Sequence, residues 1–206
     1  MKELTLVIPA KDEAECLPRI LDELKNFDCK IITQKAGGFG GALIQGIKEV
    51  ETNFLCIFNA DSSFDPQYLK NMYNELLNNC DFVFNSRYEN SGGSDDDTFL
   101  TLVGNRIFTF ICNLLFRLNI SDVLFTYVMG KTLAFKSLDL KRKDFRFCIE
   151  LPVLVKFKKY KFISKPSYER SRLSGRKKLN EFKDGFLMLL CILKMFIFRK
   201  WKKKLL

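Results

Sequence analysis

The chain has 206 residues, a length that fits one domain with a substantial hydrophobic core. Apolar residues make up 47% of it and charged residues 28%, a balance that excludes a disordered tail and a multi-span membrane protein. The sequence contains no histidine, which excludes Ser-His-Asp and Cys-His nucleophiles, histidine-ligated metals and a histidine general base.

Positive charge is concentrated in the last third of the chain. Residues 141–206 hold 21 of the 34 lysines and arginines but 5 of the 24 aspartates and glutamates, a balance of +16. Residues 1–140 hold 13 basic and 19 acidic residues, a balance of −6. A basic third on a mildly acidic body indicates a polyanionic partner, which leaves nucleic acid, an anionic membrane and a phosphorylated substrate open.

The seven cysteines form no C-x-x-C pair, and six of them lie in or beside apolar runs. This pattern is typical of reduced, buried thiols in a cytosolic protein. The opening run MKELTLVIPAKDE turns charged after a short strand-like segment, so we expect a strand there rather than a signal peptide.

Hydrophobic patterning predicts strands that alternate with helices over the first 88 residues. The expected strands are 4–10, 29–33, 53–61 and 81–88, and the expected helices are 13–26, 42–50 and 66–78, with a glycine-rich turn at 36–42. This order predicts an α/β fold with a mostly parallel sheet flanked by helices. Ligands of such sheets bind outside the carboxyl ends of the strands.

The second half of the chain is less regular. We expect residues 89–97 (ENSGGSDDD) to be a flexible loop without an apolar anchor, and residues 99–118 to be a helix with one apolar stripe. The segments 132–138 and 151–157 carry weaker patterns. No internal repeat and no linker divides the chain, apart from an expected boundary between a body of 1–180 and a terminal helix of 181–206.

The segment FNADSSFDP (58–66) suggests a metal site. Asn59, Asp61 and Ser63 alternate along extended backbone, so their oxygens can face the same way. Few protein oxygens, completed by phosphate and water, are typical of Mg²⁺ or Mn²⁺ sites. The alternative is helix capping by Asp65 before Pro66, which leaves Asp61 unexplained.

Several weak motifs occur in a specific order: LTLVIPAKDE, GGFGGA, NAD, SRY, an N…SD pair and a late R-x-x-G-x-x-K. In this order, over roughly residues 3–180, the chain resembles family 2 glycosyltransferases of the Rossmann-like GT-A fold. The group it resembles most is the polyprenyl-phosphate sugar synthases, which include dolichyl-phosphate mannose synthase.

The resemblance implies a role for each matching residue. For donor binding it implies Pro9, Ala10, Glu13, Gly38 and Gly40, with Ala42 in the same glycine-rich turn. For the metal it implies Asn59, Asp61 and Ser63. For catalysis it implies Asp61, Arg87 near a phosphate, and Asp122, paired with Asn105, as the group that activates the acceptor. Glu150 matches an acidic position before an apolar helix, and Pro166, Arg172, Gly175 and Lys178 match a mobile loop that closes over phosphates.

The chain also departs from the family pattern. The strand that usually ends in V-D-D-G-S, whose acidic residues hold base and ribose, has no counterpart here. Asn59 replaces the first aspartate of the metal motif, so metal affinity should be lower, and Thr126 stands where the family prefers glycine. These departures motivate the hypothesis of a non-catalytic, membrane-docked relative that has lost donor binding.

The basic stretch 165–178 is suited to the charge of a diphosphate leaving group. A solvated loop is the plain alternative, and a nucleic-acid-binding surface is a further one that the acidic body and Asp95–Asp97 argue against.

Residues 185–198 contain one charge, Lys194, and precede the basic run RKWKKK. A helix of that length spans about 21 Å, short of the roughly 30 Å bilayer core, so we expect it to lie in the cytoplasmic leaflet. The alternative is a helix that packs in the core.

The sequence therefore predicts a metal-dependent hexosyltransferase at the cytoplasmic face of the membrane. It would move a sugar from a nucleotide-sugar to a polyprenyl phosphate, as in cell-envelope glycan biosynthesis, with Mg²⁺ or Mn²⁺ as cofactor. The partners expected are the donor, the lipid acceptor and an anionic membrane surface, with no nucleic acid. The sugar, the nucleotide and the oligomeric state are left open.

Overall fold

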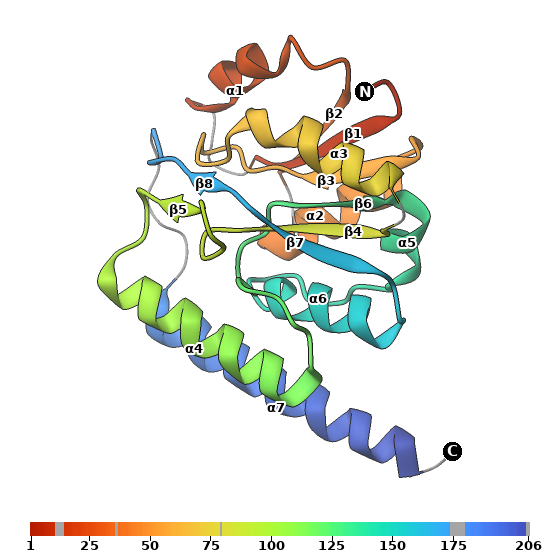
Figure 1. Ribbon diagram of the computed structural model, residues 1–206, viewed down its shortest axis with the longest axis vertical. Coiled ribbons are helices and arrows are strands. Elements are labelled where there is room, and N and C mark those ends of the chain that lie inside the picture. The colour runs from red at the N-terminus through yellow and green to blue at the C-terminus, as the bar shows by residue number, and fades with distance from the viewer. Residues whose placement is uncertain (11–14, 36, 79, 174–179, 205–206) are drawn as a thin grey trace.

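Figure 1 shows the computed structural model, which describes residues 1–10, 15–35, 37–78, 80–173 and 180–204. A six-stranded sheet in the order β2-β1-β3-β6-β4-β7 forms its centre. Strand β6 runs antiparallel to both neighbours, β3 and β4, while the other five strands share one direction. The strands are β1 (Leu4–Pro9), β2 (Lys30–Gln34), β3 (Phe54–Ile57), β4 (Phe82–Ser86), β6 (Val128–Lys131) and β7 (Phe162–Pro166). The predicted α/β fold with a mostly parallel sheet is confirmed.

Seven helices accompany the sheet among the described residues: α1 (Leu17–Leu24), α2 (Gly38–Glu49), α3 (Leu69–Leu77), α4 (Phe99–Phe116), α5 (Thr132–Ser137), α6 (Phe147–Phe157) and α7 (Glu181–Lys204). A single 3₁₀ turn, η1 (Pro66–Tyr68), leads into α3, and the Asp65 side chain accepts from the backbone N–H of Gln67 at its start. The predicted helices are all present. The main difference is that α2 begins at Gly38, so the glycines expected in a turn form its first turn.

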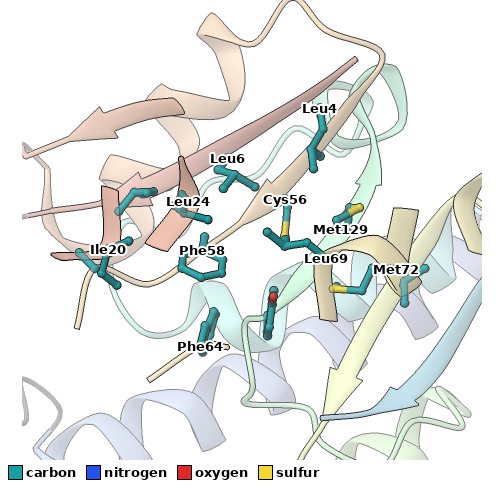
Figure 2. Close-up of a cluster of buried hydrophobic side chains, with 14 of the residues drawn as sticks. Leu4, Leu6, Ile20, Leu24, Cys56, Phe58, Phe64, Leu69, Met72 and Met129 are labelled. Atoms are coloured by element: carbon teal, nitrogen blue, oxygen red, sulfur yellow. The ribbon is translucent and has the colours of Figure 1, made fainter. Parts of the chain in front are cut away.

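Alternate side chains of the central strands enter two different cores, because successive residues of a strand point to opposite faces. In β1, Leu4, Leu6 and Ile8 pack with α1 and α3, whereas Val7 packs on the other face with α2, α5 and α6. Figure 2 shows the first of these cores, where Phe58 and Phe64 lie beside Ile20 and Leu24 of α1. Both faces of the sheet are therefore covered, which explains why the strands read as nearly continuous apolar runs.

A third core holds α4 and α7 against α6. Cys112 and Phe116 of α4 meet Met188 and Ile192 of α7, with Ile149 and Val153 of α6 beneath them. Figure 1 shows α4 and α7 side by side along one side of the molecule. Helix α7 thus shares a core with the rest of the chain, so the boundary expected at 180/181 separates no independent unit.

The segment 89–97 differs from the expected flexible loop. Its β5 (Gly93–Ser94) pairs in parallel with β8 (Tyr168–Glu169), and the Ser94 hydroxyl donates to Glu169 at 2.6 Å. The backbone N–H of Asp95 also donates to the carbonyl of Glu169. Polar and ionic contacts anchor this segment in place of the apolar contacts that a hydropathy pattern would reveal.

None of the seven cysteines forms a disulfide; six are buried and Cys29 is half-buried. The expectation of buried thiols is confirmed for six of the seven. Burial raises the pKa of six of them: Cys29, Cys56, Cys80, Cys112, Cys148 and Cys191. A raised pKa keeps a thiol protonated and unreactive near neutral pH.

Candidate active site

A pocket of about 290 Å³ lies at the edge of the sheet where the parallel strands end. Pro9 is the last residue of β1, Asn59 and Asp61 follow β3, and Arg87 follows β4. All four line the pocket. The opposite wall comes from α4 and α7. The expectation that ligands bind at the carboxyl ends of the strands therefore agrees with the position of this pocket.

Much of the pocket lining is apolar. Phe39 of α2 and Phe145 stack with their ring centroids 5.1 Å apart, and α4 and α7 add further apolar groups. The apolar side chains that line the pocket are Phe39, Phe64, Leu100, Phe108, Leu124, Phe125, Phe145, Phe182 and Met188. The pocket therefore has charged groups where the strands end, called its charged end, and an apolar lining contributed by α2, α4, α7 and the connecting loops.

Asp61 sits in a tight loop directly after β3. Its Oδ1 accepts hydrogen bonds from the backbone N–H of Ser63 at 3.1 Å and from the Ser63 hydroxyl at 2.6 Å. Ser62 between them has φ +67°, a left-handed conformation that turns the backbone sharply. These bonds leave Oδ2 of Asp61 facing the pocket, 3.6 Å from Nη1 of Arg172.

The segment before the basic loop is joined to the Asp61 loop. The backbone N–H of Arg170 donates to the carbonyl of Ser63, and that of Leu173 to the carbonyl of Asp61. The Arg170 side chain donates to the carbonyls of Ser62 and Phe64 and pairs with Glu23 of α1 at 2.9 Å. Arg170 therefore holds its own segment against the Asp61 loop and α1, a role that the sequence motif did not predict.

Arg87 lies at the centre of a buried ionic cluster. Its Nε and Nη2 donate to the two carboxylate oxygens of Asp122 at 2.7 and 3.1 Å, and Nη1 donates to Glu169 at 3.1 Å and Asp97 at 3.4 Å. Burial by itself acts to lower the pKa of Arg87, but the carboxylates of Asp122 and Glu169 raise it well above its usual value. Burial also raises the pKa of Glu169, although Arg87 opposes the shift.

Residues 7–139 match the family described as Glycosyl transferase family 2. That span is more than half of the chain. The chain belongs to glycosyl transferase family 2. Its fold is similar to solved structures of glucosyl-3-phosphoglycerate synthase from Mycobacterium tuberculosis. The complex with UDP has a TM-score of 0.66 at 12% identity, covering 94% of this chain and 79% of that chain.

Two further complexes of that enzyme show the same likeness. The one with Mn²⁺, UDP and glucosyl-3-phosphoglycerate has a TM-score of 0.67 at 12% identity, covering 93% of this chain and 78% of that chain. The one with Mn²⁺, UDP-glucose and phosphoglyceric acid has a TM-score of 0.68 at 11% identity, covering 94% and 79%. At such identity the likeness shows a shared GT-A fold for this family 2 glycosyltransferase.

The predicted donor-binding residues of this glycosyltransferase occupy different positions. Pro9 lines the pocket, while Ala10 is buried beside it. Gly38 and Gly40 contact the chain itself, because a Cβ at Gly40 would lie 2.2 Å from the carbonyl oxygen of Arg142. The backbone of α2 therefore needs its glycines to pack against residues 142–144. Glu13, Gly175 and Lys178 lie outside the described residues.

Asp122, which was predicted to activate the acceptor, and Glu150, the other carboxylate of the family pattern, do not line the pocket. The Asp122 side chain is 0% exposed, and both its oxygens accept from Arg87. Glu150 is buried in α6 and accepts from the backbone N–H groups of Lys141 and Arg142. In this arrangement Asp122 holds Arg87 and Glu150 caps a loop, so the geometry does not support either carboxylate as the base of this enzyme.

Asn105 and the two arginines predicted to bind phosphate, Arg87 and Arg172, have different surroundings in the structure. Asn105 lines the pocket and its amide donates to the Tyr88 hydroxyl at 3.0 Å. Arg87 also lines the pocket, but its donors are occupied by Asp122, Glu169 and Asp97, so it is better placed to hold the site together than to bind a phosphate. Arg172, by contrast, reaches the pocket with its side chain 29% exposed.

The oxygens at the charged end suit a divalent cation in part. Asn59 and Asp61 line the pocket, whereas Ser63 is fully buried with its hydroxyl bound to Asp61, so Ser63 orients a ligand and is not one itself. No group of three His, Cys, Asp or Glu side chains forms a metal centre within the described ranges. The donor set fits an open Mg²⁺ or Mn²⁺ site with few protein ligands, completed by phosphate oxygens and water.

The charges around the pocket also support a site for a divalent cation. The described lining residues include five carboxylates (Asp61, Asp96, Asp97, Glu169, Glu181) and two guanidinium groups (Arg87, Arg172), a net charge of −3. A diphosphate entering such a pocket requires added positive charge. Asp96, Asp97 and Glu169 were missed at the sequence level; the run of three aspartates and the Y-E-R triplet before the basic loop were the available signals.

Proposed function

We propose that this glycosyltransferase transfers a sugar from a nucleotide-diphospho-sugar to a polyprenyl phosphate at the cytoplasmic face of a membrane. The observation that carries the proposal is the composition of the pocket. Its charged groups at Asp61 and Arg172 suit phosphates, and its apolar lining, part of which comes from α4 and α7, suits a hydrocarbon chain. A ligand with both parts matches this pocket better than a small polar acceptor.

On the donor side, Asp61 and Asn59 would hold Mg²⁺ or Mn²⁺ against the diphosphate, and Arg172 and Lys178 would bind phosphate oxygens. A divalent cation neutralises the charge that develops on a diphosphate leaving group. The net charge of the described lining supports this assignment, because these residues alone supply too little positive charge for a diphosphate. The similar solved structures that contain Mn²⁺ with UDP or UDP-glucose support it as well.

On the acceptor side, the chemistry of a phosphate monoester removes the need for a strong base. Such an acceptor is already ionised near neutral pH, whereas a sugar hydroxyl must lose a proton to a positioned base. The chain has no histidine, and Asp122 is committed to Arg87. A phosphate acceptor is therefore the class that this site can serve without further groups.

A substitution at Gly104 on α4 tests whether the apolar lining of the pocket binds the hydrocarbon chain of the acceptor. It lines the pocket, and a Cβ added there meets nothing within 4 Å. Gly104→Leu should raise the KM for a long-chain polyprenyl phosphate about tenfold, because about three methylene-sized groups would fill space meant for the chain. Gly104→Ala is the matched control and should behave as wild type.

The assay would pair a panel of nucleotide-sugars with three acceptors, a long-chain polyprenyl phosphate in mixed micelles, a short water-soluble polyprenyl phosphate and 3-phosphoglycerate, with product mass as the readout. Transfer to the polyprenyl phosphates is expected. Transfer to 3-phosphoglycerate alone, the acceptor class named for the similar structures, would replace the lipid acceptor. Absence of transfer and of UDP binding with Mn²⁺ would favour the non-catalytic relative.

A membrane surface is the partner proposed for α4 and α7. Both helices carry stripes of exposed apolar side chains, which are Phe99, Leu100, Val103, Ile107, Phe110 and Leu114 on α4 and Phe182, Phe186, Leu193, Ile197 and Phe198 on α7. Among the helices that the structure describes, α4 alone has the length and composition to cross a bilayer. Its Thr109, Cys112 and Phe116 are nevertheless buried, so we place it along the surface.

Charge complementarity selects an anionic lipid surface as the occupant. The sequence continues α7 into Arg199, Lys200, Trp201 and three further lysines, and each such cation adds about 1 kcal/mol of attraction to anionic lipid. Tryptophan favours the headgroup region. Apolar stripes and a basic terminus on one helix pair together suit a peripheral, interfacial mode of binding.

Vesicle co-sedimentation tests this surface. Phe110→Ser with Leu114→Ser should weaken binding to phosphatidylglycerol vesicles at least tenfold, because two side chains, each 66% exposed, lose apolar contact with lipid. Leu77→Ser with Leu133→Ser, exposed apolar positions on α3 and α5, should leave binding unchanged. Replacing Lys200, Lys202, Lys203 and Lys204 by Gln should weaken binding and flatten its salt dependence. Equal losses in both serine pairs would argue against a defined membrane face.

A further inference from the structure

Arg172 is seated between two carboxylates at the charged end of the pocket. Its Nε donates to Oδ2 of Asp96 at 2.9 Å, and its Nη1 lies 3.6 Å from Oδ2 of Asp61. Oδ2 is the oxygen of Asp61 that Ser63 leaves unoccupied. The oxygen available for a metal ion is thus the one that faces an arginine of the same chain.

Backbone hydrogen bonds of neighbouring residues hold the main chain at Arg172 in place, whereas its side chain is 29% exposed. The residues on either side, Arg170 and Leu173, are hydrogen-bonded to the backbone of the Asp61 loop. Arg170 makes four contacts that hold it in place, whereas the Arg172 guanidinium makes two ion pairs in a partly open pocket. The Arg172 side chain can therefore change partners while its backbone stays beside the Asp61 loop.

Charge explains why Arg172 occupies this place in the ligand-free protein. Burial acts to lower the pKa of Arg172, but Asp61 and Asp96 raise it above its usual value, so the group is firmly cationic. A divalent ion on Oδ2 of Asp61 would lie next to this guanidinium, and two cations at one carboxylate oxygen repel each other. A diphosphate, in contrast, accepts hydrogen bonds from a guanidinium.

We propose that Arg172 is an exchangeable internal cation that neutralises Asp61 until metal and diphosphate arrive together, and that Asp96 is the positioning residue that keeps it within reach. Asp61 would hold the divalent ion, the Nη groups of Arg172 would be free to donate to a diphosphate, and Nε would remain on Asp96. This inference rests on the proposed function. This exchange makes the binding of metal and of nucleotide mutually dependent. Metal alone would leave Arg172 without its carboxylate partner, and diphosphate alone would leave its own negative charge without a cation.

Mn²⁺ binding measured without nucleotide, by electron paramagnetic resonance or calorimetry, tests the exchange. Arg172→Gln should bind Mn²⁺ at least tenfold more tightly than wild type, since the competing cation is gone. Arg172→Lys, which keeps the charge, should stay close to wild type. Arg106→Gln is the matched control: it removes one exposed cation from α4 that contacts the Tyr88 ring rather than Asp61, and it should change Mn²⁺ affinity little.

The same titrations repeated with UDP test the coupling and Asp96. UDP should strengthen Mn²⁺ binding more in wild type than in Arg172→Gln. Asp96→Asn should weaken UDP binding in the presence of Mn²⁺ about tenfold, and Asp96→Glu should restore most of it. Circular dichroism and thermal unfolding establish that each variant is folded.

The outcomes separate this inference from the proposed function. If Arg172→Gln and wild type bind Mn²⁺ equally while Asp61→Asn abolishes binding, the exchange is wrong and the metal site stands. If Asp61→Asn binds Mn²⁺ as wild type does, both the exchange and the metal assignment are wrong. Unchanged UDP affinity in Asp96→Asn overturns the positioning role of Asp96.

Discussion

Asp61→Asn should lower the rate of sugar transfer at least about a hundredfold while leaving the protein folded. The change keeps the shape of the side chain and an oxygen for the Ser63 hydrogen bonds, but it removes the one carboxylate of the 59–63 loop. Losses of this size are typical when a group that stabilises charge in the transition state is removed. The ion pair with Arg172 is partly exposed, so the free energy of unfolding should change by less than about 1 kcal/mol.

Initial rates at saturating Mn²⁺ and denaturant unfolding of the same preparations provide the measurement. Asn59→Asp is the companion variant, since it restores the charge expected in the family motif and should lower the Mn²⁺ concentration required for half-maximal rate. Turnover at the wild-type rate in Asp61→Asn would remove Asp61 from the metal site. An unchanged Mn²⁺ requirement in Asn59→Asp would remove Asn59.

Arg87→Gln should destabilise the fold by about 3–5 kcal/mol, because the buried carboxylates of Asp122 and Glu169 and the half-buried one of Asp97 lose the cation they share. The Asp122 side chain would be left fully buried and without its bidentate partner. Adding Asp122→Asn to Arg87→Gln should restore part of the stability, since the uncompensated charge is removed with it. Urea unfolding, read by circular dichroism, gives both free energies.

The pH dependence of Arg87→Gln has a defined sign. Burial raises the pKa of Glu169 in the folded state, and Arg87 opposes that shift, so removal of the arginine should raise the pKa of Glu169 further above its unfolded value. A raised carboxyl pKa destabilises the fold above the unfolded pKa and has no effect below it. The deficit relative to wild type should therefore be full near pH 7 and shrink as the pH falls toward 4. A variant of wild-type stability without activity would instead support the direct phosphate-binding role suggested by the S-R-Y motif.

The arrangement of the sheet could be predicted because its signals are local. Leu4, Leu6 and Ile8 are apolar for one core and Val7 for the other, so β1 reads as a continuous apolar run. The polar residues that follow β3 then mark the carboxyl edge, where Asn59 and Asp61 line the pocket. Strand order along a parallel sheet brings such strand ends together without any knowledge of side-chain contacts.

The ionic frame of the site could not be predicted because its partners are far apart in the chain. Arg87 is 35 residues from Asp122 and 82 from Glu169, and Ser94 is 75 residues from Glu169. Residues 89–97 have no periodic pattern of apolar residues, so the sequence predicts a flexible loop there. In the structure, their polar groups are hydrogen-bonded to residues distant in the chain. Likewise, whether Gly40 faces a nucleotide or the carbonyl of Arg142 depends on a distant segment that the glycine motif does not contain.

Strand β6 also illustrates a limit of pattern reading. Its four residues, Val128–Lys131, lie between β3 and β4 and run against both. A Cβ at Gly130 would lie 2.6 Å from the Phe82 ring, so the glycine is required by close packing across the sheet. A short strand with a central glycine resembles a turn until its neighbours are known.

Helix α4 serves as a wall shared by two environments. Gly104, Asn105 and Phe108 line the pocket, while Phe110 and Leu114 on the same helix are exposed on the outer surface. An acceptor dissolved in a bilayer would then reach the site by lateral diffusion beneath this wall. Under that arrangement, turnover follows the surface density of the lipid phosphate, so diluting it with inert phospholipid should slow the enzyme at constant bulk concentration. The Michaelis constant for the lipid acceptor should therefore be expressed as a mole fraction of the membrane lipid, not as a bulk concentration.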